Sequence, residues 1–382
     1  MLWHRKAKDL FWQTLYFCGG FELLHCLYGS AKVLMYHRFD HKSTFRKISK
    51  QTFESQLRML LKRFRVISLA EYTAIIRSGR LPDPDTLVLT FDDGYQDFYY
   101  YAFPILQKYG LPATLFVTTG FIDGDFWMWP DMIEYIVLHS PKSLIHLPLN
   151  GVYFRFKLDD YFSRISAWNT IADYCLTVSN PEKFQIIDSV AKVCDVRIPM
   201  APSPEYQALN WNQLRYMAQH DIEVGSHTVT HPILSRVEKA EDLVYEIQQS
   251  KKTISEQLDC DVTSFAYPNG KTGDYTVITK QVIKNAGYRC AVVSYPNSLN
   301  PNTNDMFELG RSAVGEDDVC FKKKLYNVEL PFIRYLPSIH STLWCKKNQK
   351  SLIEPENIRI QSQAQFSFRM ISPKHKANQR KI

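Results

Sequence analysis

The feature that most constrains this chain is a strand-like segment that ends on two adjacent carboxylates. Residues 86–91 form a continuous β-branched and aliphatic run, typical of a strand buried on both faces of a parallel sheet. Asp92, Asp93 and Gly94 follow directly. Adjacent carboxylates repel each other, and burial adds to the cost, so a strand end seldom carries them without a cation or a proton between them. The alternative is a solvated turn, because Asp and Gly are ordinary turn residues.

A second strand-like segment, residues 222–226, ends on a pair of histidines. His227 and His231 lie four residues apart and are followed by Pro232. A single histidine is more often structural, and two histidines at this spacing are a weak signal by themselves. One carboxylate and two imidazoles, however, form a ligand set that leaves positions open for water and substrate, as hydrolytic metal catalysis requires. Together the two strand ends favour a metal site.

Thr90–Tyr95 and Ser226–Pro232 resemble the first two motifs of the polysaccharide deacetylase family (NodB homology, carbohydrate esterase family 4). The resemblance covers about residues 32–325. It implies a distorted (β/α) barrel of about seven parallel strands and removal of acetyl groups from an N-acetylated carbohydrate. Carried over by position, it makes Asp92 the general base. It also makes Asp93, His227 and His231 the ligands of a divalent metal, for which zinc is expected.

A third segment resembles the family's groove-lining turn, which offers a backbone N–H to the oxyanion. It consists of Tyr267, Pro268, Asn269 and Gly270. The sequence departs from the family pattern just before it, because Ala266 stands where an arginine usually holds the catalytic base. Arg311 is available to replace that arginine, either by holding Asp92 or by stabilising charge. Asp274 is expected to cap the next helix.

The general acid of the family is usually a late histidine, which this chain lacks, since Arg311 lies on the corresponding strand. His37 ends the first predicted strand in a Met-Tyr-His segment that resembles a variant of the family. A histidine titrates near neutrality, so we expect His37 to protonate the leaving amine. The alternative is a structural histidine.

The alternation of strand-like and helix-like segments expected of a barrel is interrupted at residues 121–210, which predict a mostly helical insertion over the site. Its helices are expected at 131–138, 158–176 and 182–193. Aromatic residues at its beginning are either part of a core or a surface that stacks on sugar rings. These residues are Trp127 and Trp129, followed by Pro130. Residues 326–382 are expected to form a C-terminal extension with a basic, disordered tail.

Charge is unevenly distributed along the chain. Residues 1–80 carry a net charge of +10 and residues 345–382 carry +7, so the middle is −10 in a chain of net +7. This pattern argues against nucleic acid as a partner and for an anionic surface that meets the ends. Residues 1–31 combine lysines with an interrupted apolar stretch, which predicts an interfacial helix on the cytoplasmic face of a membrane. The alternative is a helix packed on the barrel.

Eight scattered cysteines without a CxxC pair indicate reduced thiols in a cytoplasmic protein. Three functions therefore compete. The first is a metal-dependent N-deacetylase acting on a glycan or lipid-linked sugar, and the second is an acetyl-ester hydrolase with the same site. The third is a carbohydrate-binding pseudoenzyme, which is favoured by the absence of both the usual arginine and the late histidine.

Overall fold

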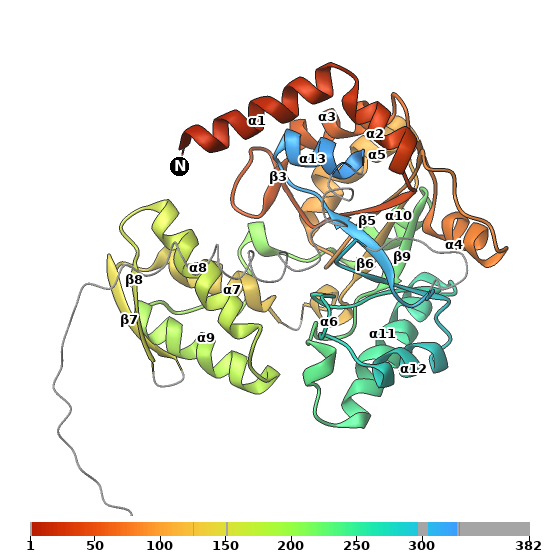
Figure 1. The fold of residues 1–382 in the computed structure, drawn as a ribbon. Coiled ribbons are helices and arrows are strands. Elements are labelled where there is room, and N and C mark those ends of the chain that lie inside the picture. Colours follow the sequence, from red (N-terminus) through yellow and green to blue (C-terminus); the bar gives the residue numbers. More distant parts are fainter. Residues whose placement is uncertain (1, 125, 150–151, 297–304, 327, 329–382) are drawn as a thin grey trace, which may run out of the picture. The chain divides into compact units, whose positions relative to one another are not determined.

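The computed structural model describes residues 2–124, 126–149, 152–296, 305–326 and 328. Seven parallel strands form a closed barrel, which the pairing of β1 with β5 completes (Figure 1). Their order is β1 (Lys32–Tyr36), β12 (Leu309–Ala313), β11 (Cys290–Val293), β10 (Ser264–Ala266), β9 (Ile222–Ser226), β6 (Ala113–Val117) and β5 (Thr86–Phe91). The short β4 (Arg65–Val66) pairs with the beginning of β5. The predicted (β/α) barrel of about seven parallel strands is therefore confirmed.

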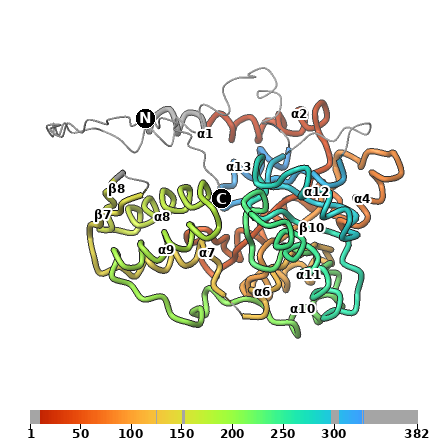
Figure 2. Tube along the Cα trace, turned by 90° about the horizontal axis from the view of Figure 1, so that it is seen from below, coloured from red at the N-terminus to blue at the C-terminus, as the bar shows by residue number. Residues whose placement is uncertain are grey.

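Helices surround the strands, as expected when parallel strands are joined by crossover connections. They are α3 (Lys50–Leu60), α4 (Leu69–Arg77), α5 (Phe103–Tyr109), α6 (Thr119–Ile122), α10 (Trp211–Ala218), α11 (Ala240–Leu258), α12 (Val277–Asn285) and α13 (Asp318–Leu325). Figure 2 shows α10, α11 and α12 side by side. Side-chain caps mark several helix starts, including Ser49 at α3 and Thr276 at α12.

Alternation along the strands separates two apolar clusters. Val88 packs with Phe116 and Ala266 of other strands and with residues of α4 in one cluster, whereas Leu87 and Leu89 belong to a second cluster with residues of helices such as α3 and α11. Side chains of a barrel strand alternate between its interior and the surrounding helices, which explains the separation. Because all seven strands are parallel, their carboxyl ends meet at one rim, and the residues that follow β5 and β9 lie there.

The insertion has its own hydrophobic core. It contains α7 (Trp129–His139), β7 (Leu144–Leu149), β8 (Val152–Lys157), α8 (Tyr161–Cys175) and α9 (Asn180–Cys194), which Figure 2 shows grouped together. The three helices match those expected from the sequence. The antiparallel hairpin of β7 and β8 was not predicted, because Pro148 within β7 argues against a strand.

Two helices precede the barrel, α1 (Leu2–Phe17) and α2 (Gly20–Tyr28). Phe21 and His25 of α2 are buried, and His25 Nε2 lies 2.8 Å from the Asp85 carboxylate. The α2 helix thus packs on the barrel, as the alternative interpretation of this segment predicts. None of the described helices is both long and apolar enough to span a membrane. The predicted C-terminal extension lies outside the described residues except for Tyr326 and Val328.

Candidate metal and hydrolytic site

The Asp-Asp-Gly segment makes a sharp turn directly after β5. The backbone φ is 78° at Asp93 and 93° at Gly94, both in the left-handed region. A Cβ atom at Gly94 would lie 2.8 Å from the end of the Ile122 side chain and 3.3 Å from Val117, so both conformation and space favour glycine here. Asp92 and Asp93 are both buried at the rim. This turn is what allows consecutive carboxylates to take different partners.

The loop after β9 has an equally unusual backbone. Thr228 has φ 71° and His231 has φ 57°. A β-branched residue such as Thr is an outlier in this region, so the loop stores strain that its surroundings must hold. His227 donates its backbone N–H to Val117, 2.9 Å away, which fixes the loop to the neighbouring strand.

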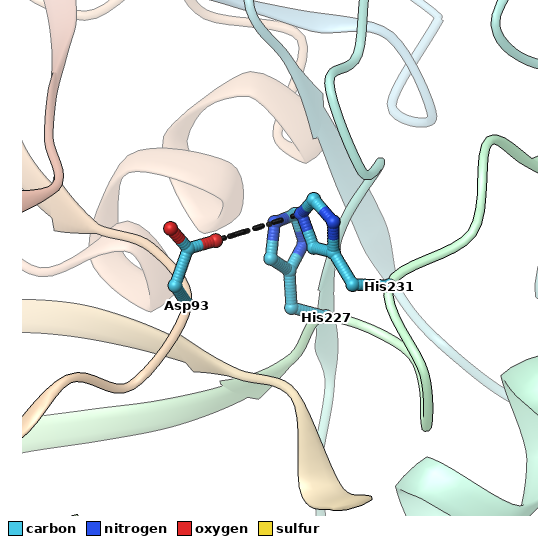
Figure 3. A group of neighbouring side chains, drawn as sticks. All are labelled: Asp93, His227 and His231. Carbon is cyan, nitrogen blue, oxygen red and sulfur yellow. Dashed lines mark ion pairs between the residues drawn. The ribbon is translucent and has the colours of Figure 1, made fainter. Parts of the chain in front are cut away.

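Asp93, His227 and His231 come together at the rim, with one candidate ligand atom from each residue within 4.8 Å of the others. The Nε2 atoms of both histidines lie 3.5 Å from Asp93 Oδ1. Figure 3 shows both rings beside this carboxylate. Two atoms about 2.1 Å from one zinc ion at a tetrahedral angle are about 3.4 Å apart, so the observed spacing fits a divalent ion.

The protonation states also fit metal binding. His227 Nδ1 lies 2.7 Å from the Ala266 carbonyl oxygen, which can only accept, so Nδ1 carries a proton and Nε2 is the ring nitrogen that faces Asp93. Burial, together with nearby His227, lowers the pKa of His231 to about 3, so this ring is neutral at pH 7. Burial alone would raise the pKa of Asp93, but His227 and His231 hold it well below its usual value.

Asp92 points to a different partner, Arg311 of β12. The guanidinium makes two parallel bonds of 2.6 and 2.7 Å to the two carboxylate oxygens, and Arg311 is only 1% exposed. Arg311 also donates to Thr90 and to the Val293 carbonyl. Burial alone would raise the pKa of Asp92, but the charges of Arg311 and His227 keep it below its ordinary value. The structure therefore places Arg311 where it can hold Asp92 as an ionised carboxylate.

His37 lies at the same rim, between β1 and β2 (Arg38–Asp40). Its Nε2 is 3.8 Å from Asp92 Oδ2, too far for a hydrogen bond, and its side chain is 43% exposed. His37 thus faces the cavity next to the candidate base rather than packing in the core.

The turn from Tyr267 to Gly270 closes another side of the cavity. Tyr267 and Asn269 line it, whereas Pro268 and Gly270 shape the turn behind them. Asn269 has φ 57°, and its backbone N–H makes no hydrogen bond with the described residues. Asp274 is not the predicted helix cap, because Thr276 caps α12. Asp274 instead accepts hydrogen bonds from the Asn269 side chain and the Lys271 backbone, so it braces this turn.

Glu246 of α11 was not predicted as a functional residue. Its carboxylate accepts the backbone N–H groups of Val229 and Thr230 at 2.8 and 2.9 Å and also contacts the Thr230 hydroxyl. These bonds hold the strained loop between the two histidines. The only sequence signal was a glutamate on the buried side of an amphipathic helix, and its partners are set by the fold.

We therefore expect Glu246→Ala to weaken metal binding about 10- to 100-fold, the usual effect of losing a residue that orients metal ligands. Competition with a chelator on the purified protein measures this without turnover. Glu256→Ala is the matched control, because Glu256 is exposed on the same helix. Equal metal affinity of the Glu246 variant and the wild type would contradict the assigned role.

The insertion is tied to the barrel by buried charges. Arg38 bonds Asp97 at 2.7 Å and Asp131 of α7 at 3.4 Å. Arg46 adds bonds of 3.0 and 2.9 Å to Asp131 and Glu134. Ion pairs this deeply buried fix geometry, because separating them leaves charges without solvation. This network could not be predicted from the sequence, because its members lie up to 96 residues apart.

The site opens into a cavity of about 400 Å3 that barrel and insertion line together. Trp129 and Pro130 belong to its lining, together with Trp168, which was not singled out from the sequence. Trp127 does not line it; this residue is buried against Tyr135 and Tyr206. Of the two tryptophans predicted at the beginning of the insertion, Trp129 therefore lies in the cavity wall and Trp127 lies in the core.

Comparisons with known proteins agree with this geometry. The sequence profile described as polysaccharide deacetylase matches residues 80–142 and 183–291. YxkH of Bacillus subtilis (strain 168), named for the same family, is 28% identical over 125 residues, covering 31% of this chain and 44% of that protein. The poly-beta-1,6-N-acetyl-D-glucosamine N-deacetylase of Staphylococcus aureus (strain MSSA476) is 33% identical over 107 residues, covering 28% of this chain and 34% of its own. The chain thus spans less than half the length of these relatives.

The solved structure of IcaB from Ammonifex degensii shares the fold. It superimposes with a TM-score of 0.50 and 18% identity, covering 78% of this chain and 97% of the other. The profile match includes both the Asp-Asp-Gly turn and the histidine loop that the barrel brings together. The chain therefore belongs to the polysaccharide deacetylase family.

Proposed function

We propose that this chain is a metal-dependent deacetylase that hydrolyses the N-acetyl groups of a glycan or lipid-linked sugar. The observation that carries the proposal is the pairing of a complete ligand set, Asp93, His227 and His231, with the Arg311-held carboxylate of Asp92 at one cavity. Relatives named poly-beta-1,6-N-acetyl-D-glucosamine N-deacetylase support this substrate class.

Asp93, His227 and His231 would hold the ion, for which zinc suits two imidazoles and a carboxylate. A bound divalent ion would polarise a carbonyl and lower the pKa of water, and these effects contribute several kcal/mol to catalysis in similar enzymes. Asp92 would accept the proton of the attacking water, because Arg311 bonds both of its oxygens and keeps it ionised beside the ligand set. The backbone N–H of Asn269 would donate to the oxyanion of the acetyl group.

His37 would complete the reaction by protonating the sugar nitrogen as it leaves, so that acetate and an ammonium sugar result. We expect His37→Ala to lower kcat by about 10²-fold or more, since general acid catalysis contributes on this scale. Metal content should stay unchanged, because His37 is 43% exposed and makes no ligand contact. Turnover close to that of the wild type would remove this assignment.

Two other functions use the same cavity. An O-acetyl ester hydrolase depends less on a general acid than an amidase does, because its leaving group is an alcohol. A pseudoenzyme would bind the glycan without turnover. Acetate release from matched N-acetylated and O-acetylated oligosaccharides, with and without chelator, separates the three. Chelator-sensitive release from the N-acetylated substrate alone supports the proposal, and release from the ester alone, or none, overturns it.

We also propose that the chain is cytoplasmic and attaches to a membrane surface through α1 and α2. Their outer face carries exposed apolar side chains, while Phe21 and His25 face the barrel. The exposed residues are Leu10, Phe11, Phe17, Leu23, Leu27 and Tyr28. The seven described cysteines are free thiols, which suits a reducing compartment.

We expect the double variant Phe17→Ser with Leu27→Ser to lose sedimentation with anionic vesicles while keeping its fold, because both side chains are exposed. Exposed Tyr153→Ser in β8 is the control. Binding by the double variant equal to that of the control would contradict attachment through these helices.

A further inference from the structure

One face of α8, continued by its C-cap residue, lines the same cavity as the reaction centre. Trp168, Ala172 and Leu176 recur every four residues and line the cavity, and Asp173 lines it beside them. These residues lie between positions 143 and 182, which the family profile leaves unmatched. The wall is therefore a feature of this chain's own insertion rather than of the matched barrel.

The carboxylate of Asp173 differs from the other charges that line the cavity. Asp92 is paired with Arg311, Asp93 contacts the two histidines, and Arg46 is bonded to Asp131 and Glu134. Asp173 is exposed and makes no hydrogen bond or ion pair with any described residue. The cavity therefore carries one unpaired negative charge, which attracts a cation to that wall.

Trp168 is held beside it in a fixed orientation. Its indole N–H donates to the Pro130 carbonyl at 2.9 Å, and its ring contacts Phe45 edge-on at 4.9 Å. The Arg46 guanidinium lies over the same ring, 4.9 Å from its centre. The indole is partly exposed and lines the cavity, so it adds a rigid apolar surface beside Asp173 against which a sugar ring can pack.

We propose that Trp168 and Asp173 form a second sugar subsite, which recognises a hexosamine whose amine is already free. This inference rests on the proposed function. Hydrolysis of an N-acetyl group leaves a primary ammonium on the sugar, so the reaction itself makes the cation that Asp173 can pair with. A glycan chain with one deacetylated unit then binds better than a fully acetylated chain, with the next acetyl group placed at the metal site.

A simpler role for Asp173 is to accept a hydrogen bond from a sugar hydroxyl. That role predicts the same loss for acetylated and deacetylated chains when the carboxylate is removed, and no dependence on salt. The subsite proposed here predicts a loss only for chains that carry an ammonium group, and a preference that weakens as salt screens the ion pair.

The test compares kcat/KM for a fully N-acetylated β-linked glucosamine pentasaccharide and for the same pentasaccharide with one free amine. The wild type should prefer the second substrate about two- to fivefold, the scale of an exposed ion pair. Asp173→Asn should abolish the preference, and Asp188→Asn, at an exposed position on α9 outside the cavity, should keep it. Equal use of both substrates by the wild type, or an unchanged preference in Asp173→Asn, overturns the proposal.

Calorimetry with a fully deacetylated glucosamine pentasaccharide separates the two proposals. Salt-sensitive binding that Asp173→Asn weakens supports the subsite even if no acetate is released from either substrate, a result that would reject the deacetylase function alone. Acetate release without such binding keeps the deacetylase function and rejects the subsite.

Discussion

Replacing His231 by alanine is expected to remove the bound metal and to lower kcat/KM on an N-acetylated oligosaccharide by on the order of 10³-fold or more, about 4 kcal/mol of transition-state stabilisation. The reason is that the Nε2 atoms of His231 and His227 both lie 3.5 Å from Asp93 Oδ1, so one missing ring leaves only two protein ligands. Metal content by elemental analysis and acetate release measure the two effects separately.

His146→Ala is the control for this variant, because His146 is exposed on β7 and far from the ligand set in sequence. Thermal unfolding of both variants without metal shows whether the loss of activity reflects loss of the fold. A His231 variant that retains one equivalent of metal and wild-type turnover would contradict the site.

Replacing Arg311 by alanine is expected to have the second largest effect. Arg311 and Asp92 are 1% and 3% exposed, and removal of one partner leaves the other charge buried without compensation. Such losses cost about 3–5 kcal/mol of folding stability. Activity should fall as well, because Asp92 loses the guanidinium that fixes both of its oxygens. Thermal unfolding and kcat/KM give the two quantities.

Arg311→Lys separates charge from geometry, since lysine keeps the positive charge but cannot make two parallel bonds. We expect it to retain more stability than Arg311→Ala and still to lose turnover. The charge of Arg311 helps to hold the pKa of Asp92 low, so in the alanine variant this pKa rises. The acidic limb of the pH–rate profile should therefore move to higher pH. An unchanged profile would mean that Asp92 is not the base or that Arg311 does not control it.

The parts of the site that lie on strand ends could be predicted from the sequence. Asp92 and His227 directly follow β5 and β9, Asp93 and His231 come one and four residues later, and parallel strands bring such ends to one rim. Arg311 could be predicted as well, because it lies on the strand that corresponds to the one carrying the family's late histidine. In both cases, local pattern and chain topology together carry the prediction.

The parts that depend on packing between distant segments could not be predicted. Glu246 resembles any helix glutamate until the fold brings it to the histidine loop, and Asp274 resembles a helix cap until the turn at Asn269 binds it. Asp173 likewise lies on an ordinary amphipathic helix, and only the position of the insertion brings it to the cavity. These roles arise from side-chain contacts that sequence periodicity does not record.

Acetate release coupled to metal analysis tests the central claim most directly. The purified protein is stripped with a chelator, assayed on an N-acetylated oligosaccharide, and assayed again after addition of one equivalent of zinc. We predict no release by the stripped protein, recovery with about one metal per chain, and no recovery in the His231→Ala variant. Acetate release that continues in the stripped protein would contradict a hydrolytic centre built on Asp93, His227 and His231.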